Sequence, residues 1–314
     1  MNPLTPNHDT TRIAGPVNGH DLRSGSGNPA ADRARRLREL HRGPEPLVLA
    51  NAWDAGSAAL FAALPGVRAL ATTSAGIAAG YAVPDGERLD LDHVLGVVAR
   101  ITDAVDIPVS VDLETGYGRS ADEVADTVAS VIEAGAAGIN LEDADPDPAR
   151  QGELFDPRDH AERLIAAGEA ARSLGVPIVV NARTDVYWVK AGPPERRMDE
   201  TVRRLHCYAD AGADCVFVPG FPGPGVDRAE QARMVGELLA RYDRTPVNLL
   251  AGSTLLTVAE LAGLGVRRLS VGSALYRLSL AAARDAFDGL LRTGRPEELA
   301  DAQRLGYDEL QRMR

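Results

Sequence analysis

Aromatic residues are scarce in this chain of 314 residues, since Phe, Trp and Tyr together make up 4% of it. The hydrophobic fraction is nevertheless 45%, so a sizeable core must be built mainly from Ala, Val, Leu and Ile. Only two cysteines are present, Cys207 and Cys215. So low a count excludes a disulfide framework and indicates two reduced thiols in a cytoplasmic protein.

Long apolar runs and basic clusters are also missing. No run approaches the length of a transmembrane helix, and the N-terminal 30 residues lack the apolar stretch of a signal peptide. The formal net charge is −11, and no run of Lys and Arg forms a patch. These features argue against nucleic acid or a membrane as partner. They still allow an anionic small substrate, because a local arginine or metal can override the global field.

The residue composition and the pattern of apolar residues change near residue 32. Residues 1–31 are rich in Gly, Pro, Asn, Ser and Asp, which predicts a disordered tail. Residues 32–314 are predicted to form one domain, in which short β-type runs alternate with helical stretches. Eight runs are strand candidates: 47–51, 69–74, 109–114, 138–143, 177–183, 215–220, 246–251 and 267–272.

The intervening segments have helical spacing. One of them, ADEVADTVASVIEAGA, places Val124, Val128, Val131 and Ile132 on one face. Apolar strands separated by helices indicate a parallel sheet that is buried on both faces. Eight such units predict a closed (β/α)₈ barrel. An open doubly wound sheet is the alternative, but NAWDAGSAAL after the first strand lacks the glycine spacing of a dinucleotide fold.

Polar residues recur at the expected C-terminal ends of the strands, where barrel active sites lie. Asp112 and Glu114 share one face of the third strand, and Glu142 ends the fourth. Carboxylates this close repel one another unless a cation intervenes. The nearby candidate ligands are oxygen donors, which favours Mg²⁺, or Mn²⁺, over Zn²⁺. Ion pairing with arginines or helix capping is the structural alternative.

Substrate recognition is assigned first to Arg183, whose planar fork can bind a carboxylate in bidentate fashion. An ion pair with Asp185 or Glu142 is the alternative role. Ser74, Ala75 and Gly76 follow the second strand and can offer backbone N–H groups to an anion. Asn248 on the seventh strand is a further substrate-binding candidate.

The motifs NAWDAGSA, TTSAG, PDGE, VDLETGYG, GINLED and NARTD, in this order, resemble the isocitrate lyase/phosphoenolpyruvate mutase superfamily over roughly residues 35 to 290. The resemblance implies a (β/α)₈ barrel with C-terminal helices and a homo-oligomer, a dimer or tetramer, in which the eighth helix is swapped between subunits. It also implies Mg²⁺ and a small carboxylate whose enolate is held on the metal.

The resemblance assigns roles position by position. Asp112 matches the Mg²⁺ ligand, and Glu114 occupies a second acidic position where Asp is commoner. Asp85 matches an aspartate that holds metal-bound water, and Glu142 matches a glutamate of the metal shell. Arg183 matches the arginine that grips the substrate carboxylate, and Ser74–Gly76 match the segment that binds the enolate carboxylate.

Two departures narrow the function. The stretch ADPDPARQGELFDPRDH stands where the lyases resemble one another in a Lys-Lys-Cys-Gly-His loop and where the phosphonate mutases carry an Asn- and Lys-bearing gate. Gly220 stands where the lyases have a substrate-binding glutamate. We therefore expect a Mg²⁺-dependent carbon–carbon lyase or decarboxylase of a small 2-oxo or 2-hydroxy dicarboxylate, with Arg183, Glu142 and Asp85 as catalytic residues.

Two other functions stay open: phosphonate P–C bond chemistry, as in the mutases and phosphonopyruvate hydrolase, and a non-catalytic protein that has kept the metal site. The proton donor or acceptor is also open, among Tyr81, Tyr187, His160 and Glu153. The loop from Asp145 to Asp159 follows the metal-bearing fourth strand and is expected to act as a mobile gate.

Overall fold

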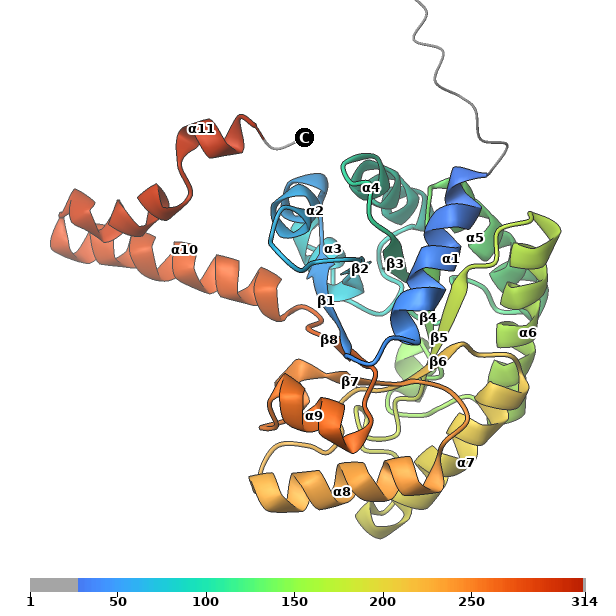
Figure 1. Cartoon of the computed structure of the whole chain (residues 1–314). Helices are drawn as coiled ribbons and strands as arrows, with labels where there is room; N and C mark the ends of the chain where they lie inside the picture. The colour runs from blue at the N-terminus through green and yellow to red at the C-terminus, as the bar shows by residue number, and fades with distance from the viewer. Residues whose placement is uncertain (1–27, 313–314) are drawn as a thin grey trace, which may run out of the picture.

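The computed structural model describes residues 28–312, and in it eight parallel strands close into a barrel in sequence order (Figure 1). The strands are β1 (Leu47–Ala52), β2 (Leu70–Thr72), β3 (Val109–Asp112), β4 (Gly138–Glu142), β5 (Val179–Arg183), β6 (Cys215–Val218), β7 (Val247–Leu250) and β8 (Arg268–Ser270). Seven of the eight expected runs contain one strand each, and β1 extends one residue beyond the expected run 47–51. The predicted (β/α)₈ barrel is confirmed.

The described part of the chain also contains helices, most of which surround the barrel (Figure 1). They are α1 (Pro29–His41), α2 (Ala55–Ala62), α3 (Ser74–Gly80), α4 (Leu91–Asp103), α5 (Ala121–Glu133), α6 (Pro157–Ser173), α7 (Arg197–Asp210), α8 (Arg228–Arg241), α9 (Val258–Leu264), α10 (Ala274–Thr293) and α11 (Tyr307–Leu310). Short 3₁₀ turns are η1 (Pro148–Arg150), η2 (Pro194–Arg196), η3 (Ala251–Ser253) and η4 (Pro296–Arg304). The domain boundary expected at residue 32 falls inside α1, and residues 1–27 of the expected tail lie outside the described part of the chain.

The local sequence explains where α5 begins and ends. Ser120 and Glu123 form a reciprocal capping box at its N-terminus. The four residues expected on one face, from Val124 to Ile132, are all buried. After the C-terminus, Gly135 adopts φ +96°, a left-handed conformation that glycine reaches without steric cost. The chain can therefore turn directly into β4.

Helix α1 covers the N-terminal end of the barrel. Leu37 forms one buried cluster with Leu47, Leu49, Ala69, Ala71, Ala137 and Val179, several of them inward side chains of the strands. Gly138 at the start of β4 permits the close approach, because a Cβ atom there would lie 2.8 Å from Cδ2 of Leu37. This apolar cluster closes the N-terminal end of the barrel, so the barrel is accessible at the C-terminal ends of its strands.

Helix α10 departs from the barrel instead of packing along it and carries the chain towards η4 and α11 (Figure 1). Val48, on the outward face of β1, remains 42% exposed in consequence. Leu280, Phe287 and Leu291 of α10 are more than half exposed as well. Within residues 28–312, no helix combines the length and apolar character that a membrane span requires.

Candidate active site at the C-terminal mouth of the barrel

A cavity of about 130 Å³ leads from the C-terminal mouth into the barrel interior. Carboxylates, amides and guanidinium groups line it, including Asp85, Asp112, Asn140, Asn181, Arg183 and Arg268. Most of these residues are inward positions of neighbouring strands. Alternation along each strand therefore brings together polar groups that lie far apart in the sequence.

Asp112 is oriented by contacts on both of its carboxylate oxygens. Oδ1 accepts a hydrogen bond from Nδ2 of Asn140 at 2.9 Å. Oδ2 accepts from Oγ of Ser74 at 3.0 Å and from the backbone N of Ser74 at 3.3 Å. Thr72 accepts from the backbone N of Asp112 at 2.9 Å. The carboxylate is thus held in one orientation at the end of β3.

Asp85 approaches Asp112 from the loop after α3. Burial raises the pKa of Asp85, and the negative charge of Asp112 raises it further. Both side chains line the cavity. Two carboxylates that line the same cavity form a place where a cation would be stabilised.

Glu114 is turned away from the cavity. Its backbone adopts φ +52°, in the left-handed region. Oε2 accepts hydrogen bonds from the backbone N atoms of Gly86 at 2.8 Å and Glu87 at 2.6 Å, and Oε1 accepts from the Tyr117 hydroxyl at 2.8 Å. Burial, aided by the charge of Asp85, raises the pKa of Glu114 to about 7.

Glu87 completes a reciprocal clamp between the two loops. Its Oε1 accepts from Oγ1 of Thr115 at 2.6 Å and from the backbone N of Tyr117 at 2.8 Å. The acidic residue of the PDGE loop therefore holds the TGYG turn, while Glu114 holds the PDGE loop. The clamp fixes where the neighbouring Asp85 lies.

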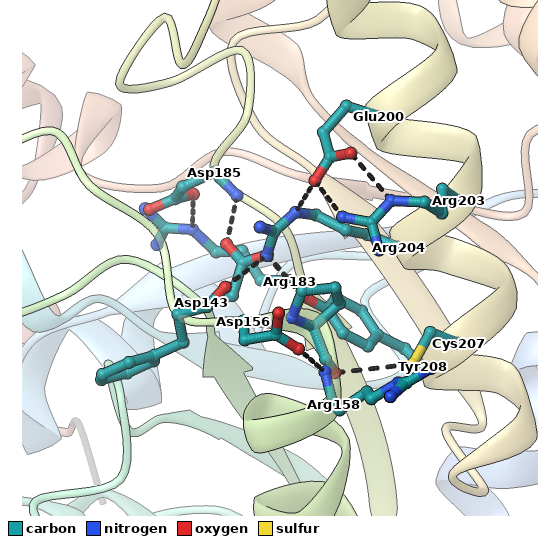
Figure 2. A network of polar contacts seen from close by, with 12 residues as sticks. Asp143, Asp156, Arg158, Arg183, Asp185, Glu200, Arg203, Arg204, Cys207 and Tyr208 are labelled. Carbon is teal, nitrogen blue, oxygen red and sulfur yellow. Dashed lines mark hydrogen bonds and ion pairs between the residues drawn. The ribbon is translucent and has the colours of Figure 1, made fainter.

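Arg183 is engaged by two protein carboxylates. Nη1 lies 2.5 Å from Oε2 of Glu142, while Nε and Nη2 donate to the two oxygens of Asp185 at 2.6 and 2.9 Å. Figure 2 shows the Asp185 side of this arrangement. The neighbouring negative charges raise the pKa of Arg183, and burial raises that of Glu142. The ion pairs considered as an alternative role for Arg183 are therefore present.

Asp143, next to Glu142 in the sequence, faces a different environment (Figure 2). Its side chain accepts hydrogen bonds from Arg204 at 2.8 Å, from the Tyr208 hydroxyl at 2.5 Å and from the backbone N of Asp185 at 2.8 Å. All four of these side chains are buried. This network supports the acid that holds Arg183, so it is a structural support of the site.

The donor set around the cavity fits Mg²⁺. No group of three or more His, Cys, Asp or Glu side chains arranged to hold a metal occurs within residues 28–312. Mg²⁺, however, usually keeps several waters and binds through only one or two carboxylates. Asp85 and Asp112 provide such a pair of hard oxygen donors at one cavity wall. Glu114 and Glu142 do not line this cavity but line an adjoining depression together with Asp85.

The segment from Ser74 to Gly76 is only partly directed into the cavity. Ser74 and Ala75 line it. Gly76 instead packs against Trp53, because a Cβ atom at this position would lie 3.2 Å from Cβ of Trp53. Asn248 is fully buried and donates to Oγ of Ser270 at 3.1 Å, and it does not line the cavity.

The four candidates for the acid or base do not line the cavity either. His160 is fully buried against Tyr208, and Glu153 is exposed and pairs with Arg150. Tyr187 packs on Phe221, and Tyr81 is 47% exposed.

Several cavity residues were not singled out from the sequence. Asn51 on β1 accepts at Oδ1 from the backbone N atoms of Val271 and Gly272, both at 3.0 Å, and so fixes the chain after β8. Arg268, Trp188 and Arg277 also line the cavity. A signal for Arg268 exists, since it precedes Ser270 by two residues and therefore shares its inward face.

The chain matches the protein-family model described as phosphoenolpyruvate phosphomutase over residues 37–291. It is 36% identical to an uncharacterised protein of Mycobacterium tuberculosis, over 80% of this chain and 86% of that one. It is 30% identical to the 2-methylisocitrate lyase of Escherichia coli, over 77% of this chain and 79% of the enzyme.

Two solved structures that carry small carboxylates share the architecture. One is phosphonopyruvate hydrolase in complex with oxalate and Mg²⁺, with a TM-score of 0.76, 26% identity and coverage of 89% of this chain and 94% of that one. The other is oxaloacetate acetylhydrolase in complex with its product oxalate, with a TM-score of 0.74, 27% identity and coverage of 86% and 90%.

Proposed function

Because this chain belongs to the phosphoenolpyruvate mutase/isocitrate lyase superfamily, we propose that it is a Mg²⁺-dependent enzyme that cleaves a carbon–carbon bond in a small 2-oxo or 2-hydroxy dicarboxylate. The observation that carries the proposal is the facing pair of carboxylates, Asp85 and Asp112, in a cavity that Arg183 also lines. Decarboxylation of the same class of acid is included, since it too breaks a bond next to a carbonyl group.

Asp85 and Asp112 would hold the metal. When bound, Mg²⁺ would act as a Lewis acid that stabilises the negative charge developing beside the breaking bond. The bonds from Ser74 and Asn140 already fix the Asp112 carboxylate, so little reorganisation is needed on binding. The Glu87–Glu114 clamp performs the same task for the loop that carries Asp85.

Arg183 would bind the substrate carboxylate with its remaining donors. A guanidinium has five N–H groups, and three nitrogen-to-carboxylate contacts are made to Glu142 and Asp185. The remaining N–H groups can donate to a ligand in the cavity. Glu142 and Asp185 then act as positioning residues that fix the plane of the fork.

The loop between β4 and α6 argues for a substrate other than a tricarboxylate. Residues 145–159 contain neither cysteine nor lysine. The thiol that the resemblance places in the methylisocitrate lyases therefore has no counterpart here. We therefore favour a smaller acid, whose cleavage does not need a thiol from that loop.

The test is a Mg²⁺-dependent screen of 2-oxo and 2-hydroxy dicarboxylates that follows release of pyruvate, glyoxylate and CO₂. EDTA should abolish turnover, and Mg²⁺ or Mn²⁺ should restore it while Zn²⁺ does so poorly. Asp112→Asn should be inactive, whereas the exposed Asp103→Asn should behave like the wild type. Full activity of a metal-stripped protein would contradict the mechanism.

Cleavage of a P–C bond is the second candidate, and the match to the phosphomutase family model favours it. Release of phosphate from phosphonopyruvate would identify it. Absence of turnover in both assays, with Mg²⁺ and carboxylates still binding, would indicate a non-catalytic binding protein.

We also propose a homo-oligomer in which α10 packs against a neighbouring subunit. The outward face of β1 at Val48 is exposed, and α10 presents exposed apolar side chains away from its own barrel. Exchange of this helix between subunits would bury both surfaces.

A further inference from the structure

The cavity reaches an arginine inside the barrel that the mechanism above does not use. Arg268 begins β8 and is only 2% exposed. It lies beside Leu47 of β1 and Asn248 of β7 in the strand register. It nevertheless lines the same cavity as Asp85 and Asp112. A positive charge therefore lies at the bottom of a pocket whose mouth is acidic.

Arg268 has weak partners in the described part of the chain. Nη2 is 3.4 Å from Oγ of Ser110, and Nη1 is 3.4 Å from Nε2 of His41. Nε has no hydrogen-bond partner among residues 28–312, and no carboxylate there forms an ion pair with this side chain. Arg183, by contrast, forms ion pairs with Glu142 and Asp185.

His41 does not balance the charge of Arg268, because its side chain carries no negative charge. Its Nδ1 donates to the carbonyl oxygen of Leu37 at 2.8 Å, which leaves Nε2 as an acceptor towards Arg268. Burial and the charge of Arg268 lower the pKa of His41 to about 3. The imidazole is therefore neutral, and the buried guanidinium has no directly paired carboxylate in the described part of the chain, although Asp112 attracts it from a distance. A buried charge without a partner is costly, so its partner is expected to come from outside the chain.

A second unpaired polar atom lines the same cavity. Nδ2 of Asn181 donates to Oδ1 of Asn140 at 2.8 Å, and Nδ2 of Asn140 donates to Asp112. This relay fixes the amide of Asn181 with its oxygen free. Within residues 28–312, that oxygen is buried and has no donor. It would accept a hydrogen bond from a hydroxyl group or from a bridging water.

The spacing between the two ends of the cavity follows from β3. Ser110, which contacts Arg268, precedes Asp112 by two residues on the same inward face. At about 3.3 Å per residue, the Ser110 level lies roughly 7 Å below Asp112. A four-carbon dicarboxylate has about five bonds between an oxygen of one carboxylate and an oxygen of the other, and at about 1.5 Å per bond this path reaches such a distance.

We propose that Arg268, Ser110 and Asn181 form a buried carboxylate-binding subsite at the bottom of the cavity. It would take the second carboxylate of a dicarboxylate whose first carboxylate lies at Asp85, Asp112 and Arg183. A hydroxyl group on the ligand, or a water, would donate to Asn181. The proposal deepens the proposed function and rests on it, because it specifies the distal end of the substrate.

The test measures binding and needs no turnover. Succinate and butyrate have equal chain length but differ in their second carboxylate, and calorimetry would give the affinity of each. We expect the wild type to prefer succinate by roughly tenfold or more, the effect of one charge-assisted hydrogen bond. Arg268→Met should remove this preference. Arg267→Met, the same charge change at the adjacent outward residue, should leave it intact.

Each outcome decides the proposal. A succinate preference that survives in Arg268→Met, or its absence from the wild type, would overturn the subsite and leave Arg268 as a water-solvated structural group. If Arg268→Met fails to fold by circular dichroism, Arg268→Lys and a comparison of succinate with its neutral-ended monoamide in the wild type decide instead. Failure of the enzyme proposal looks different: no turnover in the screen, with the Arg268-dependent preference still present.

Discussion

Nη1 of Arg183 lies 2.5 Å from Oε2 of Glu142, and this pair joins the ends of two neighbouring strands. Asp185 takes the other side of the same guanidinium. The group expected to hold a substrate carboxylate is thus also a buried structural cross-link. We therefore expect a change at Arg183 to affect stability as well as the proposed binding.

Arg183→Lys should therefore lower stability as well as catalytic efficiency. Lysine keeps the charge but loses the fork, so at least one buried charge-assisted bond, worth about 1.5–3 kcal/mol, is lost. Urea unfolding should report a decrease of that order, and kcat/KM should fall by roughly tenfold or more. Arg203→Lys, which alters an exposed pair with Glu200, is the control. An Arg183→Lys protein of unchanged stability would show that the observed pairing contributes little.

Removing the carboxylate of Asp112 and that of Glu114 should have different effects on Mg²⁺ binding. Mg²⁺ at about a hundred times its Kd should stabilise the wild type by about 2.7 kcal/mol, because it binds only the folded state. Asp112→Asn should lose this stabilisation. Glu114→Gln should largely keep it, because both Glu114 oxygens are used by loop groups. Thermal melting with and without Mg²⁺ measures both, and equal losses in the two variants would place Glu114 in the metal shell.

The lowered pKa of His41 predicts that the folded protein loses stability in acid. Its pKa is lowered to about 3 in the folded protein, chiefly by burial, and the ordinary value is 6.5. Between these values the unfolded chain binds more protons, so stability falls as the pH drops from about 6.5 towards 3. One such group contributes a slope of up to about 1.4 kcal/mol per pH unit.

His41→Gln, which keeps a donor and an acceptor but does not titrate, should reduce that slope. His160, whose pKa burial lowers to about 4, would still contribute. Urea unfolding at pH 4.5 and pH 7 in both proteins provides the measurement. Identical slopes would mean that His41 is not held neutral.

The loop from Asp145 to Asp159 should become more protected when ligand is bound. Arg150 contacts Asp145 and Glu153 within the loop, Leu154 pairs with Ala144 just before it, and Phe155 is anchored from outside by Arg204. The loop borders the depression that Asp85, Glu114 and Glu142 line. Closure would exclude water during bond cleavage. Hydrogen exchange with and without oxalate plus Mg²⁺ tests this, and equal protection in both states would identify the loop as fixed architecture.

The exposed face of α10 predicts association. Leu280, Phe287 and Leu291 recur at intervals of seven and four residues and so lie on one side of the helix. Leu291→Asp should reduce the mass measured by light scattering to that of a smaller species, whereas Arg292→Asp, one position round the helix, should not. A wild-type monomer would exclude the proposed exchange of helices.

The sequence by itself determined the barrel. Apolar runs of strand length, separated by stretches with helical spacing, allow little other than parallel β/α units, and eight of them close a barrel. It also identified Asp112 and Arg183 as residues of the mouth, because strand-terminal polar residues of parallel strands meet at one end.

Tertiary structure decided how these side chains are used. The pairing of Arg183 with Glu142 depends on the register between β4 and β5, which no local pattern encodes. The left-handed backbone of Glu114 directs its carboxylate to the loop groups of Gly86 and Tyr117, contacts that the sequence pattern does not reveal. Arg267 and Arg268 are adjacent residues of the same type, yet only the side chain of Arg268 lines the cavity, because side chains alternate along a strand. Side-chain partners are set by which strands and loops come together, and that is a property of the closed barrel.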